Sequence, residues 1–140
     1  MSTVAPARTD WRAIRRTRVI AVFGAVLANL VVWAIAVPLA GIDLTVDTGA
    51  GRTEVGPAAV AVVTMLAGLL GWTLLGLLQR RTRRAVPIWT AVAVAVLVVS
   101  LAGPLGAATT TAAGVTLVGM HLMAGAIVIP LLARTAARRP

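Results

Sequence analysis

Four apolar runs, separated by connections that alternate between arginine-rich and arginine-poor, constrain this chain more than any other feature. The runs extend over residues 19–40, 57–78, 86–103 and 113–133. Each is close to the roughly 20 residues that a helix needs to cross a hydrocarbon core about 30 Å thick. Because a bilayer core offers no water to backbone groups, and the runs lack the alternation of barrel strands, all four are predicted to be helices.

Composition supports the same class. The chain is 59% hydrophobic and only 12% charged, whereas soluble domains carry roughly 25% charged residues. It contains no cysteine, which excludes disulfides, thiol redox chemistry, cysteine zinc sites and iron–sulfur clusters. We therefore predict an all-α membrane protein built as a four-transmembrane-helix bundle.

The arginines predict how this bundle is oriented. All thirteen basic residues are arginines, and twelve of them fall on alternate connections. Since short cytoplasmic loops are enriched in basic residues, both termini are predicted to be cytoplasmic. The chain then divides into a basic leader (1–18), a transmembrane domain (19–133) and a basic tail (134–140), in the plasma membrane. A cleaved signal peptide is the alternative for the first run, which is longer than the 7–15 residues of a signal core.

The chain has a net charge of +9. Because the arginines fall on alternate connections, we expect them to bind anionic lipids of the inner leaflet and not nucleic acid. An arginine near such a surface contributes on the order of 1 kcal/mol to binding. We expect a short helix in the leader to lie on the inner leaflet. The arginines predicted to contact lipid headgroups are Arg12, Arg15, Arg16, Arg18, Arg80, Arg81, Arg83 and Arg84.

The first outer connection, "GIDLTVDTGAGRTEVGP", changes character from its flanking runs. With "TGAG" as the turn, Asp47 faces Arg52 and Thr45 faces Glu54, so that apolar and polar residues fall on opposite faces, as in a half-buried hairpin. We predict a short β-hairpin on the outer mouth of the bundle. Asp43, Asp47 and Glu54 are candidate calcium ligands, but one of them faces an arginine. A solvated polar face is favoured, and no metal site is predicted.

His121, the one histidine of the chain, lies within the fourth run in "GVTLVGMHLMAGAIVIP". An ionisable residue inside a span is by default a functional hypothesis, because its burial is costly. Asn29 lies at comparable depth when the two runs are laid out at about 1.5 Å per residue. Three interpretations stay open: an interhelical hydrogen bond between His121 and Asn29, ligand or proton handling by the pair, and a histidine that lines a wet outer vestibule.

Small residues and tryptophans predict how the helices pack. Ala21, Gly24, Ala25 and Ala28 recur at helical spacing, and such stripes let helices approach closely in lipid. We expect them to form the packing face of the first helix. Trp89, at the inner end of the third run, suits the aromatic belt at the membrane interface.

Several motifs together resemble a known family. They are "VGP", "GWTLLGLLQRR", "SLAGPLGA" and "HLMAGAIVIPLLAR", and the similarity extends from about Arg18 to Arg134. The chain resembles a family of small, uncharacterised four-span membrane proteins from high-GC Gram-positive bacteria, known as a domain of unknown function. The resemblance implies a plasma-membrane location and the four-helix arrangement. It supplies no catalytic residue, ligand or partner.

Two function classes follow. The favoured one is a non-enzymatic accessory or structural protein of the envelope, with a possible homo-oligomer or membrane-protein partner. The alternative is a small transporter or ligand-binding bundle that uses His121 and Asn29. An enzyme is not expected, because the chain has one histidine, no carboxylate within a span and no nucleophile beside a base. No cofactor is expected either, since bis-histidine haem ligation would require a dimer to supply the second imidazole.

Overall fold

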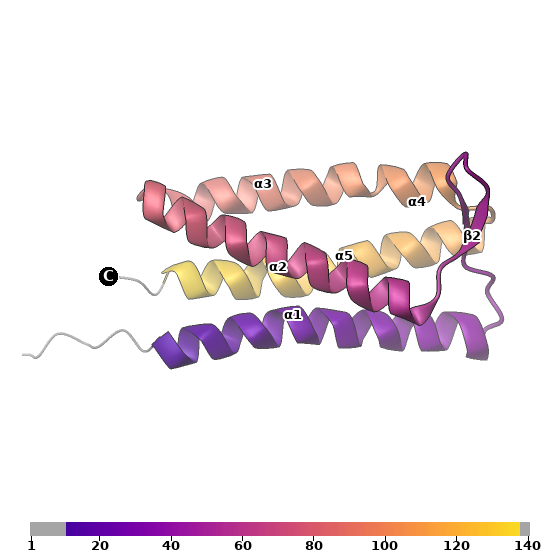
Figure 1. Cartoon of the computed structure of the whole chain (residues 1–140), viewed down its shortest axis with the longest axis horizontal. Coiled ribbons are helices and arrows are strands. Elements are labelled where there is room, and N and C mark those ends of the chain that lie inside the picture. The colour runs from indigo at the N-terminus through magenta and orange to yellow at the C-terminus, as the bar shows by residue number, and fades with distance from the viewer. Residues whose placement is uncertain (1–10, 138–140) are drawn as a thin grey trace, which may run out of the picture.

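The structure, a computed structural model, describes residues 11–137 and consists of long helices that run side by side (Figure 1). Four of its helices are long and apolar enough to cross a membrane, and the predicted fold class is confirmed. The helices are α1 (Trp11–Ala34), α2 (Pro57–Arg81), α3 (Ala85–Ser100), α4 (Ala102–Ala107) and α5 (Thr111–Ala137). A π-helical turn, Ile35–Leu39, extends α1, and α4 continues the span that α3 begins.

The helices are longer than the predicted spans, mainly at one end of the bundle. α1 begins at Trp11, so residues 11–18 form its first turns and are not a separate leader helix. α2 continues to Arg81, and α5 to Ala137. Pro57 stands in the first turn of α2, where its missing N–H costs no hydrogen bond. Residues 1–10 of the leader and 138–140 of the tail lie outside the described residues.

α5 contacts both α1 and α3, while α2 packs against α1 and also against α3. Figure 1 shows why: α2 runs obliquely, close to α1 where it begins and close to α3 where it ends. The start of α1, the α2–α3 turn and the end of α5 lie at one end of the bundle, which we call the arginine end. The strands lie at the opposite end, the hairpin end.

Apolar side chains form two buried clusters, one toward each end. The cluster toward the arginine end comprises Ala21, Leu75, Trp89, Leu132 and Ala136. The cluster toward the hairpin end comprises Leu44, Val60, Ala113, Leu117 and Met120. Many other large apolar side chains face outward, including Leu70 (69% exposed) and Val99 (73% exposed). Soluble monomers rarely expose large contiguous apolar surfaces, so these outward faces suit lipid.

Close packing of α1 depends on small residues, but not on every residue of the predicted stripe, because a Cβ atom at Gly24 would meet nothing within 4 Å. Ala21 and Ala25 are completely buried. A Cβ atom built on Gly68 of α2 would lie 3.1 Å from the methyl groups of Val22. The absence of a side chain at Gly68 therefore allows the two helices to approach closely.

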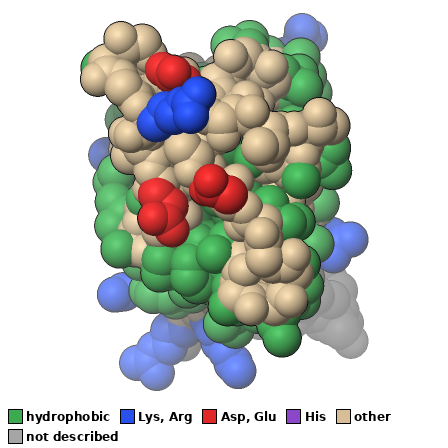
Figure 2. Space-filling model, turned by 90° about the vertical axis from the view of Figure 1, so that its right-hand side faces the viewer, with side chains coloured by type: hydrophobic (Ala, Val, Ile, Leu, Met, Phe, Trp, Pro, Cys, Tyr) green, Lys and Arg blue, Asp and Glu red, His purple; other side chains and the backbone are tan. Residues whose placement is uncertain are grey.

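The predicted hairpin is confirmed. Strands β1 (Thr45–Asp47) and β2 (Arg52–Glu54) are antiparallel, and their residue pairs are those that the sequence predicts. Gly49 (φ +81°) and Gly51 (φ +125°) supply the left-handed backbone of the turn. The Thr109 N–H donates to the Thr45 carbonyl at 3.1 Å, which holds the hairpin against the α4–α5 connection. Viewed from this end, acidic side chains gather on the exposed face (Figure 2).

Candidate functional site

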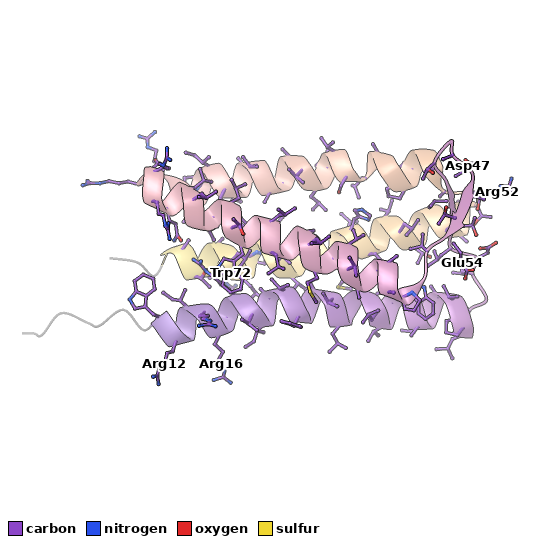
Figure 3. The ribbon with its side chains drawn as sticks, in the orientation of Figure 1. Arg12, Arg16, Asp47, Arg52, Glu54 and Trp72 are labelled. Atoms are coloured by element: carbon purple, nitrogen blue, oxygen red, sulfur yellow. The ribbon has the colours of Figure 1, made fainter. Side chains whose placement is uncertain are left out.

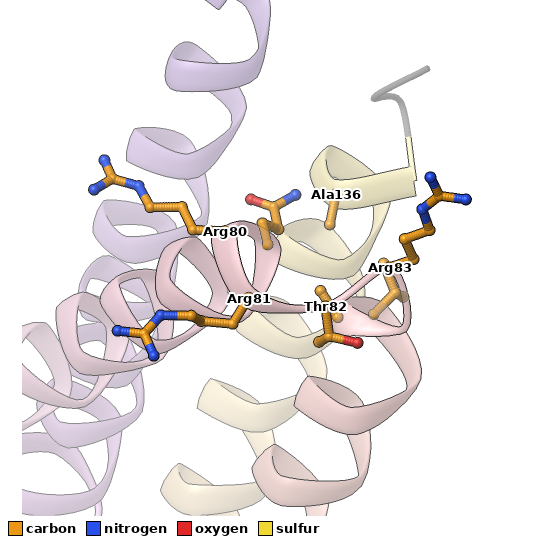
Figure 4. Close-up of a pocket in the computed structure, with 8 residues that line it drawn as sticks. Arg80, Arg81, Thr82, Arg83 and Ala136 are labelled. Atoms are coloured by element: carbon orange, nitrogen blue, oxygen red, sulfur yellow. The ribbon is translucent and has the colours of Figure 1, made fainter.

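An open pocket lies at the arginine end, between the end of α2, the turn into α3 and the end of α5 (Figure 4). Its volume is about 820 Å³, within the range of roughly 300–1,000 Å³ that is typical of small-molecule sites. We call it the arginine pocket. Its lining residues are Gln79, Arg80, Arg81, Thr82, Arg83, Ala85, Val86 and Ala136.

The turn between α2 and α3 positions the polar side of this pocket. Thr82 ends α2 in an extended conformation, and its N–H donates to the Leu78 carbonyl at 2.9 Å. The Thr82 hydroxyl oxygen accepts a hydrogen bond of 3.1 Å from the Arg84 N–H. Arg80 and Arg81 stand in the last turn of α2, where positive charge complements the negative end of the helix dipole.

The arginine pocket contains several hydrogen-bond donors. The Gln79 side-chain oxygen accepts from the Nη2 of Arg18 at 3.1 Å, and because a guanidinium only donates, the Gln79 amide NH₂ is left for the pocket. The Thr82 oxygen already accepts from Arg84, so its O–H is available to donate. Among the described residues that line the pocket, none has a carboxylate side chain. The site is therefore suited to an anion.

Behind the pocket, Arg18 joins three helices. Only 6% of this residue is exposed, and its Nε donates to the Oγ1 of Thr135 on α5 at 2.9 Å. Its guanidinium carbon lies 5.9 Å from the ring centroid of Trp72 on α2, a distance typical of a cation–π contact. We call Arg18, Gln79, Trp72 and Thr135 the arginine node. Burial of Arg18 in this node differs from the headgroup contact predicted for it.

The other arginines predicted to contact lipid headgroups are exposed at the arginine end: Arg12, Arg15, Arg16, Arg80, Arg81, Arg83 and Arg84. Arg12 and Arg16 point away from the bundle (Figure 3). In Figure 4 the side chains of Arg80 and Arg81 extend to one side of the pocket and that of Arg83 to the other, so that their guanidinium groups are spread around its open edge. Sequence reasoning missed the roles of Gln79 and Thr82, although Gln79 precedes the arginines of "QRRTRR" and Thr82 interrupts them.

Asn29 and His121 are not brought together as predicted. The Asn29 Nδ2 donates to the Oγ1 of Thr64 on α2 at 3.1 Å, while the Nδ1 of His121 lies 2.7 Å from the Leu117 carbonyl oxygen of its own helix. Asn29 is 4% exposed, and His121 is partly buried. Asn29 and His121 were predicted to pair because they lie at similar depth. Because α1 contacts both α2 and α5, depth alone could not show that Asn29 bonds to a residue of α2.

Asn29 and His121 line neither the arginine pocket nor a second pocket at the hairpin end. The second pocket, of about 510 Å³, lies at the hairpin end against α4 and the start of α5. Its lining residues carry no charge: Pro104, Leu105, Ala108, Thr109, Thr110, Thr111, Gly114, Val115 and Val118. The polar groups of this pocket are the threonine hydroxyls and backbone groups, so it lacks the charge of the arginine pocket.

Trp89 corrects another expectation. It is 1% exposed, and its indole N–H donates to the Gly71 carbonyl of α2 at 2.8 Å, so it packs within the bundle and not in an interfacial belt. Trp33 has a comparable bond from its indole N–H to the Val55 carbonyl at 2.9 Å. That bond connects α1 to the segment that follows β2.

The hairpin acids do not form a metal centre in the described part of the chain. The Asp43 carboxylate accepts from the Thr45 hydroxyl, and the Asp47 carboxylate accepts from the Gly49 N–H at 3.0 Å. Among residues 11–137, no group of three or more His, Cys, Asp or Glu side chains is placed to hold a metal ion. Asp47, Arg52 and Glu54 lie at the opposite end from Arg12 and Arg16 (Figure 3).

Comparison with protein families places the chain in a family. Residues 9–138 match the model of a family of unknown function, DUF6069. The chain belongs to this family. The DUF6069 match covers the four helices, the hairpin, the arginine pocket and the arginine node, and it confirms the resemblance to a domain of unknown function. Comparisons with curated proteins and with solved structures give no match.

Proposed function

We propose that this member of DUF6069 is a non-enzymatic accessory or structural protein of the plasma membrane of a high-GC Gram-positive bacterium. One observation carries the proposal: polar side chains in the interior are engaged in holding helices together. Arg18 bonds to Thr135 and Gln79, and Asn29 bonds to Thr64, each across a helix interface. The outer surfaces are then the parts of the molecule that remain to act on lipid and on partners.

The charge distribution supports a cytoplasmic location for the arginine end. Arg52 is on the hairpin, whereas the other described arginines lie on the first turns of α1, around the α2–α3 turn or near the end of α5. Basic residues are retained on the cytoplasmic side of membrane proteins. In this orientation the exposed arginines face the anionic headgroups of the inner leaflet, and the hairpin faces outward.

A non-enzymatic role agrees with the environment of His121. Its Nδ1 is hydrogen bonded to the Leu117 backbone carbonyl, whereas a general base is normally oriented by a polar side chain and directed at a nucleophile. Asn29 likewise pairs with Thr64. Both residues are proposed to be structural.

One observation favours a second candidate, a small transporter or ligand-binding bundle. Within the described residues, the Oδ1 of Asn29 is buried and accepts no hydrogen bond. A buried acceptor without a partner costs free energy, and a bound polar molecule could supply the missing donor. This candidate requires Asn29, and with it His121, to contact a ligand in the middle of the bundle.

Purification of the native full-length protein in mild detergent separates the two candidates. The co-purifying proteins and small molecules are identified for the wild type and for the variants Asn29→Leu and His121→Leu. An accessory protein is expected to retain membrane-protein partners and phospholipid equally in all three samples. A polar small molecule present in stoichiometric amount in the wild type, and absent from both variants, would support the transporter instead.

A further inference from the structure

We propose that the arginine pocket is a specific binding site for an anionic glycerophospholipid, whose phosphate is held by Gln79 together with the arginines that line the pocket. This inference rests on the proposed membrane location, and it goes beyond diffuse attraction between arginines and an anionic surface. It assigns a ligand class to one site, between the ends of α2 and α5 (Figure 4).

The first argument is the chemistry of the lining. Three arginines and two neutral polar residues line the pocket. The acceptor atoms of the neutral groups are already engaged, the Gln79 oxygen by Arg18 and the Thr82 oxygen by the Arg84 N–H. The Gln79 NH₂, the Thr82 O–H and the arginine N–H groups are donors, which match the acceptor-only oxygens of a phosphodiester.

The arginine node gives the pocket a fixed wall. Arg18 is buried and bonded to Gln79 and Thr135, so the side-chain amide of Gln79, which lines the pocket, is held through its oxygen. Ala136, which follows Thr135, lines the same pocket. A site with a held donor distinguishes ligands more sharply than mobile surface arginines do.

Shape and apolar lining favour a lipid over a free phosphate ion. The volume of about 820 Å³ far exceeds that of a single phosphate. Ala85, Val86 and Ala136 form an apolar part of the lining, which suits the glycerol and first acyl carbons of a lipid. Basic pockets between helices on the cytoplasmic side of membrane proteins are the usual places for anionic headgroups.

The test is lipid binding to the purified full-length protein in mild detergent, followed by native mass spectrometry. Phosphatidylglycerol, phosphatidylcholine and glycerol 3-phosphate are titrated separately. We expect phosphatidylglycerol to be retained at least about tenfold better than phosphatidylcholine, and glycerol 3-phosphate not to compete at equal concentration. Equal retention of the two lipids would overturn the proposal, and effective competition by glycerol 3-phosphate would assign the pocket to a soluble phosphate compound instead.

A matched pair of variants separates the pocket from the overall charge. Arg80→Gln with Arg83→Gln removes two charges from the pocket, and Arg15→Gln with Arg16→Gln removes two exposed charges of α1 at the same end. The pocket variant is expected to weaken phosphatidylglycerol binding about twentyfold, since one arginine near anionic lipid is worth roughly fivefold. The α1 variant is expected to change it by less than about threefold. Equal losses in the two variants would contradict a specific site.

Gln79→Glu removes the NH₂ donor of Gln79 but keeps an oxygen that can accept from Arg18 in the arginine node. A carboxylate can still accept from Arg18, so the thermal unfolding temperature is expected to be unchanged or higher, while phosphatidylglycerol binding falls at least about tenfold. Full lipid binding by a folded Gln79→Glu variant would overturn the role of Gln79. These measurements in detergent are independent of orientation and of protein partners, so their failure leaves the proposed accessory function standing.

Discussion

Arg18 and Thr135, which are 117 positions apart in the chain, are joined by a hydrogen bond of 2.9 Å from the Arg18 Nε to the Thr135 Oγ1. The bond connects the beginning of α1 to the end of α5. Both residues are buried, with 6% and 2% of their surfaces exposed. Thr135 in turn donates from its hydroxyl to the Leu132 carbonyl at 2.7 Å, which orients its oxygen for Arg18.

Thr135→Val is expected to destabilise the protein. Valine keeps the shape of threonine but leaves the charged Nε donor of Arg18 without this acceptor. A hydrogen bond to a charged group contributes about 1.5–3 kcal/mol, and we expect a loss in this range in the free energy of unfolding. The measurement is denaturant unfolding in mild detergent.

Thr73→Val provides the control. Thr73 is exposed, and its hydroxyl donates to the Leu69 carbonyl of its own helix. An exposed substitution of this kind changes stability by no more than about 0.5 kcal/mol. Equal effects of the two valine substitutions would show that the bond between Arg18 and Thr135 contributes nothing specific.

A double-mutant cycle tests the hydrogen bond between Asn29 and Thr64. We expect Asn29→Leu combined with Thr64→Val to cost less than the sum of the single changes, by about 0.5–2 kcal/mol, because removal of both partners leaves no newly unsatisfied group. The parallel cycle of Asn29→Leu with His121→Leu is expected to be additive within about 0.5 kcal/mol. Coupling in the second cycle and additivity in the first would restore a pairing of Asn29 with His121.

Gly68→Ala tests the close contact between α1 and α2. The added methyl group would lie 3.1 Å from the side chain of Val22, a buried and β-branched residue that has little freedom to move. Overpacking of this kind costs about 1–3 kcal/mol, measured as the change in unfolding free energy in detergent.

Gly76→Ala is the matched change on the same helix. No atom lies within 4 Å of a Cβ at Gly76. Alanine there is expected to be neutral or to stabilise by up to about 1 kcal/mol, because it favours the helix more than glycine does. A destabilisation by Gly76→Ala as large as that by Gly68→Ala would contradict the packing of α1 on α2.

The sequence was sufficient to predict the helices and the hairpin, because each depends on a local pattern. A span of about 20 apolar residues has few alternatives to a helix in lipid. The pairing of Asp47 with Arg52 follows from the two-residue period and from one turn. The limits of α1 were predicted less well, because Trp11 and the arginines that follow it belong to the helix although their composition is that of a leader.

The interior bonds could not be predicted in the same way, because they depend on how each helix is rotated about its axis and on which helix is its neighbour. In the sequence Arg18 follows other arginines, which are exposed. Arg18 differs from them because it faces Gln79 and Thr135 and donates hydrogen bonds to both. Trp89 is buried between helices, where its indole N–H donates to the Gly71 carbonyl. For the arginine pocket, the sequence predicted that Arg80, Arg81 and Arg83 contact lipid headgroups. It did not predict the contributions of Gln79 and Thr82.

In the proposed topology this chain crosses the plasma membrane four times with its arginine end in the cytoplasm. It contains no native cysteine, so single cysteines can be introduced without further changes. Thr3 and Arg134 are suitable positions for the two terminal segments, and Ala50, exposed in the hairpin turn, reports on the opposite end. Thr135 is unsuitable, because it is buried and bonded to Arg18.

Accessibility of these cysteines to a membrane-impermeant thiol reagent in intact cells is the most direct test. We predict that a cysteine at Ala50 reacts, whereas cysteines at Thr3 and Arg134 react only after the membrane is permeabilised. Reaction of the cysteine at Thr3 or at Arg134 in intact cells, or protection of the one at Ala50, would contradict the proposed topology.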